Sequence, residues 1–235
     1  MRRCASHAVF FVYRYGGRSG WFRDVGCRPR PIIDAGGRVR HAPGTDRKEL
    51  IMANTTITDN AVLNTIDMAD RDTARTEFAR VCEYLHGQRE LDARLISSMA
   101  RMLSMRLAVR DALIIAAIRP DMVDADAMAA FAFEPHEPRT ATLMGRLLSG
   151  AFDTGDGYDA EPLDRFDTLV GEAGHEPDAP DAQCLAVRAY LAWWKRDKDT
   201  AMRLAFEALA LSEDCTLAGI VCAALTRGIM PREQA

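Results

Sequence analysis

The fold of this chain is decided by residues 181–231, which have the sequence DAQCLAVRAYLAWWKRDKDTAMRLAFEALALSEDCTLAGIVCAALTRGIMP. Apolar residues recur there at helical spacing and predict three α-helices, over residues 181–196, 198–212 and 215–227. The turns between these segments are very short, and short connections make neighbouring helices pack antiparallel. We therefore expect a helical hairpin with a third helix packed beside it.

Small residues stand where these paired helices must approach closely, at Ala189, Ala192, Ala201, Ala205 and Ala208. Their spacing is similar to that of a tetratricopeptide repeat, a helical hairpin that stacks into arrays. The proline that ends such a repeat is missing near Glu213, and the stretch contains one good unit, whereas an array needs about three repeats to be stable. The prediction is one tetratricopeptide-like hairpin docked on a larger helical bundle.

The remainder of the chain after Met52 also favours helices, so the predicted fold class is all-α. Helical spacing of apolar residues predicts further helices over residues 70–86, 89–105, 106–118, 128–133, 140–152 and 163–174. Gly87 and Pro120 end two of them, and either Asp124 or Asp126 caps the short helix that follows. The segment LAVRDALIIAAI is the most apolar and is predicted to be central in the bundle.

Residues 1–51 differ chemically from the rest of the chain. They hold ten Arg and one Lys against three Asp and one Glu, a net charge of +7, whereas the other residues hold 19 basic and 30 acidic groups, a net charge of −11. Lys48 and Glu49 can be encoded AAG GAG, which has the form of a bacterial ribosome-binding site, and two codons separate them from Met52. We expect residues 1–51 to be a mis-assigned start, or otherwise a disordered basic leader.

Residues 1–51 have three other interpretations: a secretory signal, a mitochondrial transit peptide and a basic binding arm. A secretory signal is disfavoured because its apolar run, AVFFVY, is interrupted by Arg14. A mitochondrial transit peptide is disfavoured by the bacterial form of the start. An Arg-rich arm binds nucleic acid or anionic lipid, but if translation begins at Met52 the net negative product repels phosphate and no nucleic acid is expected. The chain then has a polar lead-in over 52–68 and one helical domain over 69–235.

The expected organism is a bacterium with a GC-rich genome, because arginine outnumbers lysine 27 to 3. The expected compartment is the cytoplasm. No apolar run approaches the ~18 residues of a membrane helix, so no membrane is expected as a partner. The cysteines after Met52 form neither a CxxC pair nor a compact framework, which is typical of buried thiols in a reducing compartment. They are Cys82, Cys184, Cys215 and Cys222.

Three segments together resemble a known family: VRDALI, TLMGRLLSG and the run from Tyr190 to Pro231. They are similar to the C-terminal half of the actinobacterial domain of unknown function numbered 4192. The shared features are a Trp near the end of one helix, an Ala-rich helix begun by Asp, and a last helix closing with Gly-x-x-Pro, here Gly228 and Pro231. The resemblance covers residues 88–231. Members usually carry an N-terminal half with strands, which this sequence lacks, and the family name implies no chemistry.

Two short motifs favour structural over catalytic interpretations. DTG at residues 153–155 is the tripeptide of aspartic proteases, in which two such carboxylates share a proton. It occurs once, after a predicted helix, so we interpret it as a turn. Cys82 and His86 lie four residues apart and could place two metal ligands on one helix face, but neither HExxH nor CxxC accompanies them. No metal and no cofactor is therefore predicted.

Histidines and carboxylates in the loops carry the alternative hypothesis, which is a hydrolase or another small-ligand or metal-dependent enzyme. The residues that could pair as acids and bases are Glu134, His136, Glu137, His175 and Glu176. The acidic loop over residues 153–167 matches an EF-hand in no register. Polar loop residues are far more often solvated than catalytic, so no catalytic residue is predicted.

The adjacent Trp193 and Trp194, followed by Lys195 and Arg196, make the candidate partner-binding site. Adjacent helical residues point about 100° apart, so both Trp side chains are buried only if the helix packs on two sides. Trp194 lies on the apolar stripe and is predicted to be core. Trp193 shares a face with Tyr190, and that pair is either core or an exposed aromatic anchor.

The leading hypothesis is therefore a protein-interaction or scaffold module without catalysis, which binds a protein partner. Its candidate partner-binding residues are Tyr190, Trp193, Lys195 and Arg196.

Overall fold

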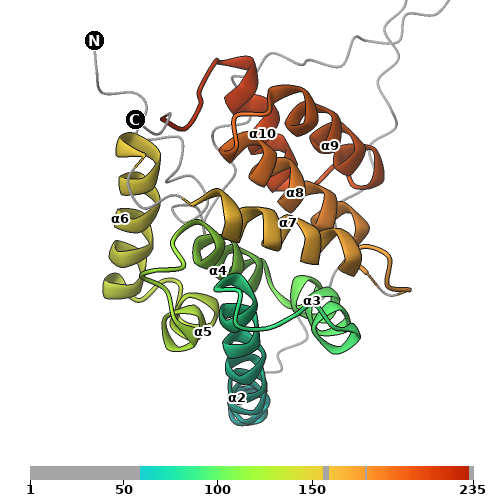
Figure 1. Ribbon diagram of the computed structural model, residues 1–235. Helices are drawn as coiled ribbons and strands as arrows, with labels where there is room; N and C mark the ends of the chain where they lie inside the picture. Colours follow the sequence, from blue (N-terminus) through green and yellow to red (C-terminus); the bar gives the residue numbers. More distant parts are fainter. Residues whose placement is uncertain (1–58, 156–158, 178, 233–235) are drawn as a thin grey trace, which may run out of the picture. The chain divides into compact units, whose positions relative to one another are not determined.

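The computed structural model describes residues 59–155, 159–177 and 179–232, and all regular secondary structure in these ranges is helical (Figure 1). The helices are α2 (Asp59–Leu85), α3 (Ala93–Met105), α4 (Leu107–Ile118), α5 (Ala125–Phe133), α6 (Pro138–Thr154), α7 (Ala160–Ala173), α8 (Asp181–Trp194), α9 (Lys198–Leu211) and α10 (Thr216–Thr226). The all-α prediction is confirmed.

The first helix is longer than predicted. It begins at Asp59, so the predicted polar lead-in over 52–68 is wrong from Asp59 onward. Adding a residue to an existing helix costs far less than starting one, so the apolar segment that follows can extend the helix into a polar sequence.

Residues 1–51, predicted to be a leader, lie outside the described residues. The chain divides into two units at Asp67, and the contacts below lie among the described residues from Asp67 onward.

Several helix ends follow the sequence signals. Gly87 has φ +69°, and the backbone N–H groups of Gly87 and Gln88 donate to the carbonyls of Tyr84 and Glu83, the Schellman pattern that ends α2. Asp124, rather than Asp126, caps α5, because its Oδ1 accepts from the Ala127 backbone N at 2.8 Å.

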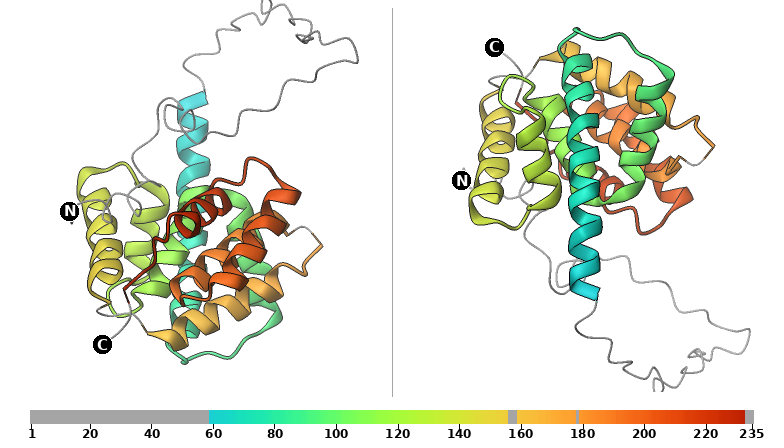
Figure 2. Two further views of the ribbon diagram at one scale, coloured as in Figure 1. Left: turned by 90° about the horizontal axis from the view of Figure 1, so that it is seen from above. Right: turned by 90° about the horizontal axis from the view of Figure 1, so that it is seen from below.

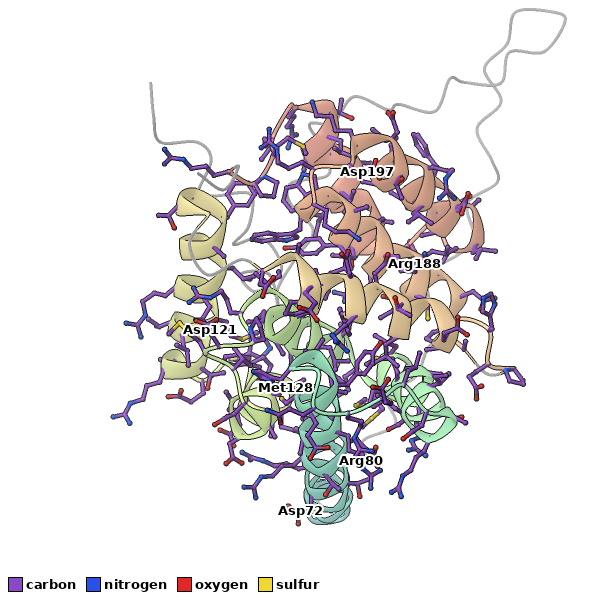
Figure 3. All side chains as sticks on the ribbon, viewed as in Figure 1. Asp72, Arg80, Asp121, Met128, Arg188 and Asp197 are labelled. Carbon is purple, nitrogen blue, oxygen red and sulfur yellow. The ribbon has the colours of Figure 1, made fainter. Side chains whose placement is uncertain are left out.

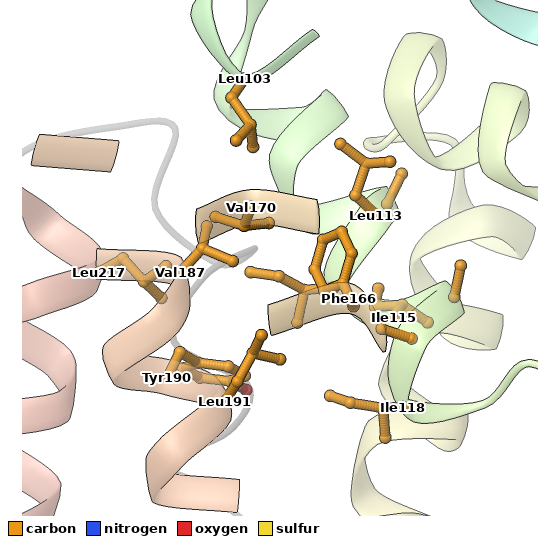
Figure 4. Close-up of a cluster of buried hydrophobic side chains, with 14 of the residues drawn as sticks. Leu103, Leu113, Ile115, Ile118, Phe166, Val170, Val187, Tyr190, Leu191 and Leu217 are labelled. Carbon is orange, nitrogen blue, oxygen red and sulfur yellow. The ribbon is translucent and has the colours of Figure 1, made fainter. Parts of the chain in front are cut away.

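Helix α4 is central, as predicted. All of its residues from Val109 to Ile118 are buried. Helix α7 packs against α3 and α4 on one side and against α8 on the other, and α8, α9 and α10 follow as the last layer (Figures 1 and 2). Figure 4 shows side chains of these elements meeting in one core, with Phe166 of α7 between α4 and α8. None of the described helices is long and apolar enough to span a membrane.

Helices α8 and α9 form the predicted hairpin. The five alanines expected at the close approach are all buried, with 0–4% of their surface exposed. Helix α10 packs against both partners of the hairpin. Small side chains thus let the two helix axes come close together, which is the packing that the sequence predicts.

A buried ion pair within α4 is linked to α8 by a hydrogen bond. The Arg110 guanidinium, 2% exposed, donates to Asp111 Oδ1 through Nε at 2.8 Å and Nη2 at 2.7 Å. Its Nη1 donates to Gln183 Oε1 at 2.9 Å. A charge inside an apolar core is tolerated when it is paired and hydrogen-bonded in this way.

Candidate functional site

The predicted aromatic site on α8 lies in the interior. Tyr190 is 5% exposed and Trp193 is 2% exposed, so neither is available as a surface anchor. Figure 4 shows Tyr190 beside Leu191 within the buried cluster. The exposed alternative for this pair is therefore wrong. Trp194, also 2% exposed, is core as predicted.

Trp193 is buried by elements that lie far from α8 in the sequence. The Phe152 ring of α6 lies 5.6 Å from the Trp193 ring, centroid to centroid. The indole Nε1 donates to the Ile229 carbonyl at 2.9 Å. The chain reaches that position because Gly228, with φ +68°, ends α10 and turns the following residues back across α8. The Arg232 backbone N then donates to the Phe152 carbonyl at 3.0 Å.

The phenol of Tyr190 lies in the same interior. Burial raises its pKa from 10.0 to about 12, and the hydrogen bond with Trp194 opposes that rise. Burial raises the pKa because it disfavours the charged phenolate.

The two cations that follow are also engaged by their own chain. Lys195 Nζ lies 3.0 Å from Asp164 Oδ1 and 3.6 Å from Asp167 Oδ2, both on α7. The Arg196 guanidinium donates to the Pro231 carbonyl. These contacts fix the end of α8. Arg196 is exposed and Lys195 is half-buried, but Tyr190 and Trp193 are buried, so the four residues do not form one exposed surface.

Cys82 and His86 make structural contacts near the end of α2. Cys82 Sγ lies near the Val123 carbonyl at 3.9 Å, and burial raises the pKa of its thiol to about 11. His86 Nδ1 lies 2.7 Å from the carbonyl of Cys82. Within the described ranges, no group of three or more His, Cys, Asp or Glu side chains is arranged to hold a metal ion. Asp153 and Thr154 are the last two residues of α6, and Gly155, at φ +73°, is its C-cap, so DTG ends a helix rather than forming the predicted turn.

The loop carboxylates of the enzyme hypothesis have structural contacts. Glu137 caps α6 by accepting from the Thr140 backbone N at 2.9 Å. Glu134 pairs with Arg71. Glu176 accepts from Ser97 Oγ at 2.7 Å, which ties the turn after α7 to α3. The structure does not bring these carboxylates together around one substrate-sized space.

A shallow groove lies elsewhere, between α2 and the start of α5. Its volume is about 540 Å³, and its lining residues are Asp72, Arg75, Thr76, Ala79, Asp124, Ala125 and Asp126. Figure 3 labels one of these residues, Asp72, on α2. Asp124 caps α5 and Asp126 pairs with Arg75, so these carboxylates also have structural partners.

The most exposed apolar side chains lie on α9. This helix was not among the binding sites predicted from the sequence. Phe206 is 60% exposed. It stands between Met202 and Leu209, which are half-buried, at spacings of four and three residues, so the three share one helix face. We call Met202, Phe206 and Leu209 the outer stripe. The adjacent face of α9, about 100° around the helix axis, carries the buried alanines Ala201, Ala205 and Ala208. The sequence of α9 contains two apolar stripes rather than one, and the second stripe is the signal that indicates an exposed apolar face.

Acidic residues lie near both ends of the outer stripe. Asp199 precedes Met202 by three residues on the same helix face, whereas Glu213 lies in the turn beyond the end of α9, after the extended residue Ser212. Asp199 and Glu213 are exposed, and within the described residues neither takes part in an ion pair. The nearest paired charges, Arg203 and Glu207, bind each other at 2.8 Å beside the stripe.

Comparison with known proteins adds no assignment. No family model, curated protein or solved structure matches this chain.

Proposed function

We propose that this protein is a protein-interaction or scaffold module without catalysis, and that its contact surface is the outer stripe of α9. The observation that supports this most is Phe206, a large aromatic side chain with 60% of its surface in solvent. Aromatic residues are enriched among the side chains that dominate binding energy at interfaces, and keeping one exposed gains nothing for folding.

The packing of the C-terminal helices supports the same proposal. Alanines make the α9 contact with α8, and Phe206 on the adjacent face of α9 is exposed, where a neighbouring helix packs in a tetratricopeptide-like stack. The resemblance to the domain of unknown function 4192 is consistent with a helical module and adds no activity. The proposed compartment is the cytoplasm, where Cys82, Cys184, Cys215 and Cys222 would remain free thiols.

The test compares two full-length variants with the natural protein, each with a C-terminal tag at the native locus. Phe206→Ser removes the anchor, and Met122→Ser is the control because Met122 is 54% exposed in the turn after α4. We expect a stoichiometric protein partner with the natural chain and with the Met122 variant, and its loss with the Phe206 variant. Recovery of the same partner with Phe206→Ser, or of none with the natural chain, would contradict the proposal.

A further inference from the structure

We infer that residues 229–232 are a strap that occupies a binding site for an extended peptide, and that a partner segment with the same order of apolar, apolar, proline and basic residues replaces it. The strap follows α10 and runs toward the end of α6 (Figure 1). Its hydrogen-bond partners on α6 and α8 are Phe152, Asp153, Trp193 and Arg196, which we call the strap site. This site is separate from the outer stripe of α9, so the inference goes beyond the proposed function.

Helix α8 binds the main chain of the strap rather than its side chains. The indole Nε1 of Trp193 donates to the Ile229 carbonyl at 2.9 Å. The Arg196 guanidinium donates to the Pro231 carbonyl, two residues further along the strap. Extended peptides are recognised in this way, because hydrogen bonds to alternate main-chain groups give affinity that does not depend on the sequence.

Helix α6 binds the other end of the strap with carbonyl groups of its last turn. The Arg232 backbone N donates to the Phe152 carbonyl at 3.0 Å, and the Arg232 Nη1 donates to the Asp153 carbonyl at 3.4 Å. Carbonyls in the last turn of a helix lack an intrahelical donor, so they can accept from another segment. The strap site thus offers two donors from α8 and two acceptors from α6 to one extended chain.

The burial of the strap side chains defines which segment fits. Pro231 is buried, Ile229 and Met230 are half-buried against the core, and Arg232 is exposed. A partner segment with two apolar residues, a proline and a basic residue in that order reproduces both this burial and the hydrogen bonds.

The strap can leave without breaking a helix. Its bonds to α6 and α8 come from two side chains and from carbonyls at a helix end. Gly228, at φ +68°, precedes it, and an added Cβ there would meet nothing within 4 Å. Glycine adopts positive and negative φ with similar ease, so this residue can redirect the strap. Segments with few buried contacts open locally at a low cost in free energy.

An empty strap site is nevertheless unfavourable. Trp193 is 2% exposed, and loss of the Ile229 carbonyl leaves its indole N–H without that acceptor. A buried donor without an acceptor costs more than the hydrogen bond itself contributes. Replacement of the strap by another extended segment is therefore favoured over simple opening.

The first experiment tests whether the strap opens independently of the fold. Native-state hydrogen exchange is measured by NMR on the natural full-length chain at increasing low concentrations of urea. We expect the Arg232 amide to exchange at least about tenfold faster than the buried Leu191 amide of α8, with almost no dependence on urea. Exchange of both amides at the same rate and with the same urea dependence would make the strap part of the core and overturn the inference.

The second experiment tests replacement with a fluorescein-labelled peptide, RGIMPR, which has the sequence of residues 227–232. A scrambled peptide of the same composition is its control. Fluorescence anisotropy follows both against the natural full-length chain, Pro231→Gly and Gly228→Ala. The first variant removes the buried strap side chain, and the second disfavours the backbone turn that begins the strap. We expect RGIMPR to bind each variant at least about tenfold more tightly than the natural chain, in which the strap competes for the site.

Two further variants locate the bound peptide. Arg196→Gly, added to Pro231→Gly, removes a donor of the strap site while glycine suits its φ of +64°, and it should weaken RGIMPR about threefold or more. Phe206→Ser, added to Pro231→Gly, should leave the affinity unchanged. Circular dichroism confirms that each variant is helical.

Three results would overturn the inference. One is equal binding of RGIMPR and the scrambled peptide, and another is no gain in affinity over the natural chain in a folded variant. The third is loss of RGIMPR binding with Phe206→Ser, which would place the peptide on the outer stripe. If both Pro231→Gly and Gly228→Ala lose their helical signal, the strap is required for folding and the inference also fails.

Discussion

Helices α8 and α9 are partners in one hairpin, yet they use their apolar residues in opposite ways. Tyr190, Trp193 and Trp194 of α8 are at most 5% exposed, whereas Phe206 of α9 is 60% exposed. Helix α8 packs against α7, α9 and α10, and it is also covered by α6 and the C-terminal segment. Helix α9 packs against α8 and α10. The number of neighbours, rather than the aromatic content, decides which helix presents an apolar face to solvent.

The largest expected effect is at the interior face of α8. Trp193→Ala should lower the free energy of unfolding by about 3–5 kcal/mol, because it removes a buried ring and leaves the Ile229 carbonyl without its donor. Urea denaturation followed by circular dichroism measures this. An unchanged denaturation midpoint combined with lost partner binding would place Trp193 on the surface after all.

A buried ion pair should contribute more to the free energy of unfolding than an exposed one. Asp111→Ala leaves the Arg110 guanidinium buried without its carboxylate and should cost about 3 kcal/mol of unfolding free energy. Glu207→Ala removes an exposed partner of Arg203 on α9 and should cost about 0.5 kcal/mol or less. Chemical denaturation of both variants gives the comparison, and equal losses would refute it.

Alkaline pH should lower the free energy of unfolding through a buried thiol on α8. Burial, with Asp181 adding to it, raises the pKa of the Cys184 thiol from 9.0 to about 11. The unfolded chain then loses this proton first, so the stabilisation is complete below pH 9 and is lost as pH rises to 11. We expect unfolding free energy to fall on the order of 2 kcal/mol across this window from this thiol. In Cys184→Ala the unfolding free energy should fall less steeply between pH 9 and 11. A fall as steep as that of the natural chain would exclude the thiol as its source.

The turn between α8 and α9 should show a smaller effect, which comes from the backbone conformation of Arg196. Arg196 has φ +64°, and its N–H and that of Asp197 donate to the carbonyls of Trp193 and Ala192, the Schellman position that favours glycine. Arg196→Gly and Arg196→Ala both lose the contact with Pro231 and differ only in the backbone. Arg196→Gly should therefore be more stable than Arg196→Ala by about 1 kcal/mol in thermal or urea unfolding. The opposite order would show that the turn relaxes out of this conformation.

The smallest effect on stability should come from the outer stripe. Phe206→Ser should change the free energy of unfolding by less than about 0.5 kcal/mol, because the side chain is already mostly in solvent. Differential scanning calorimetry beside Met122→Ser checks this. A loss as large as that of Trp193→Ala would mean that Phe206 is part of the core.

Sequence periodicity predicted the helices well because each signal is local. The apolar stripe of α4, Gly87 after α2 and the alanines of α8 and α9 act through residues three to five positions away. The burial of Trp193 was not predictable in this way, since it depends on Phe152 and on a tail that returns after Gly228. The same holds for Phe206, which is exposed because no described helix packs over it, and for the Arg110 partner Gln183, which comes from α8.

The central claim is that α9 rather than α8 presents the contact surface, and hydroxyl-radical footprinting with mass spectrometry tests it most directly. The full-length protein is labelled alone and in complex with its co-purified partner. The account predicts that Met202 and Phe206 are oxidised in the free protein and protected in the complex, while Tyr190 and Trp193 stay unmodified in both. Oxidation of Tyr190 and Trp193 in the free protein, with protection in the complex, would contradict it.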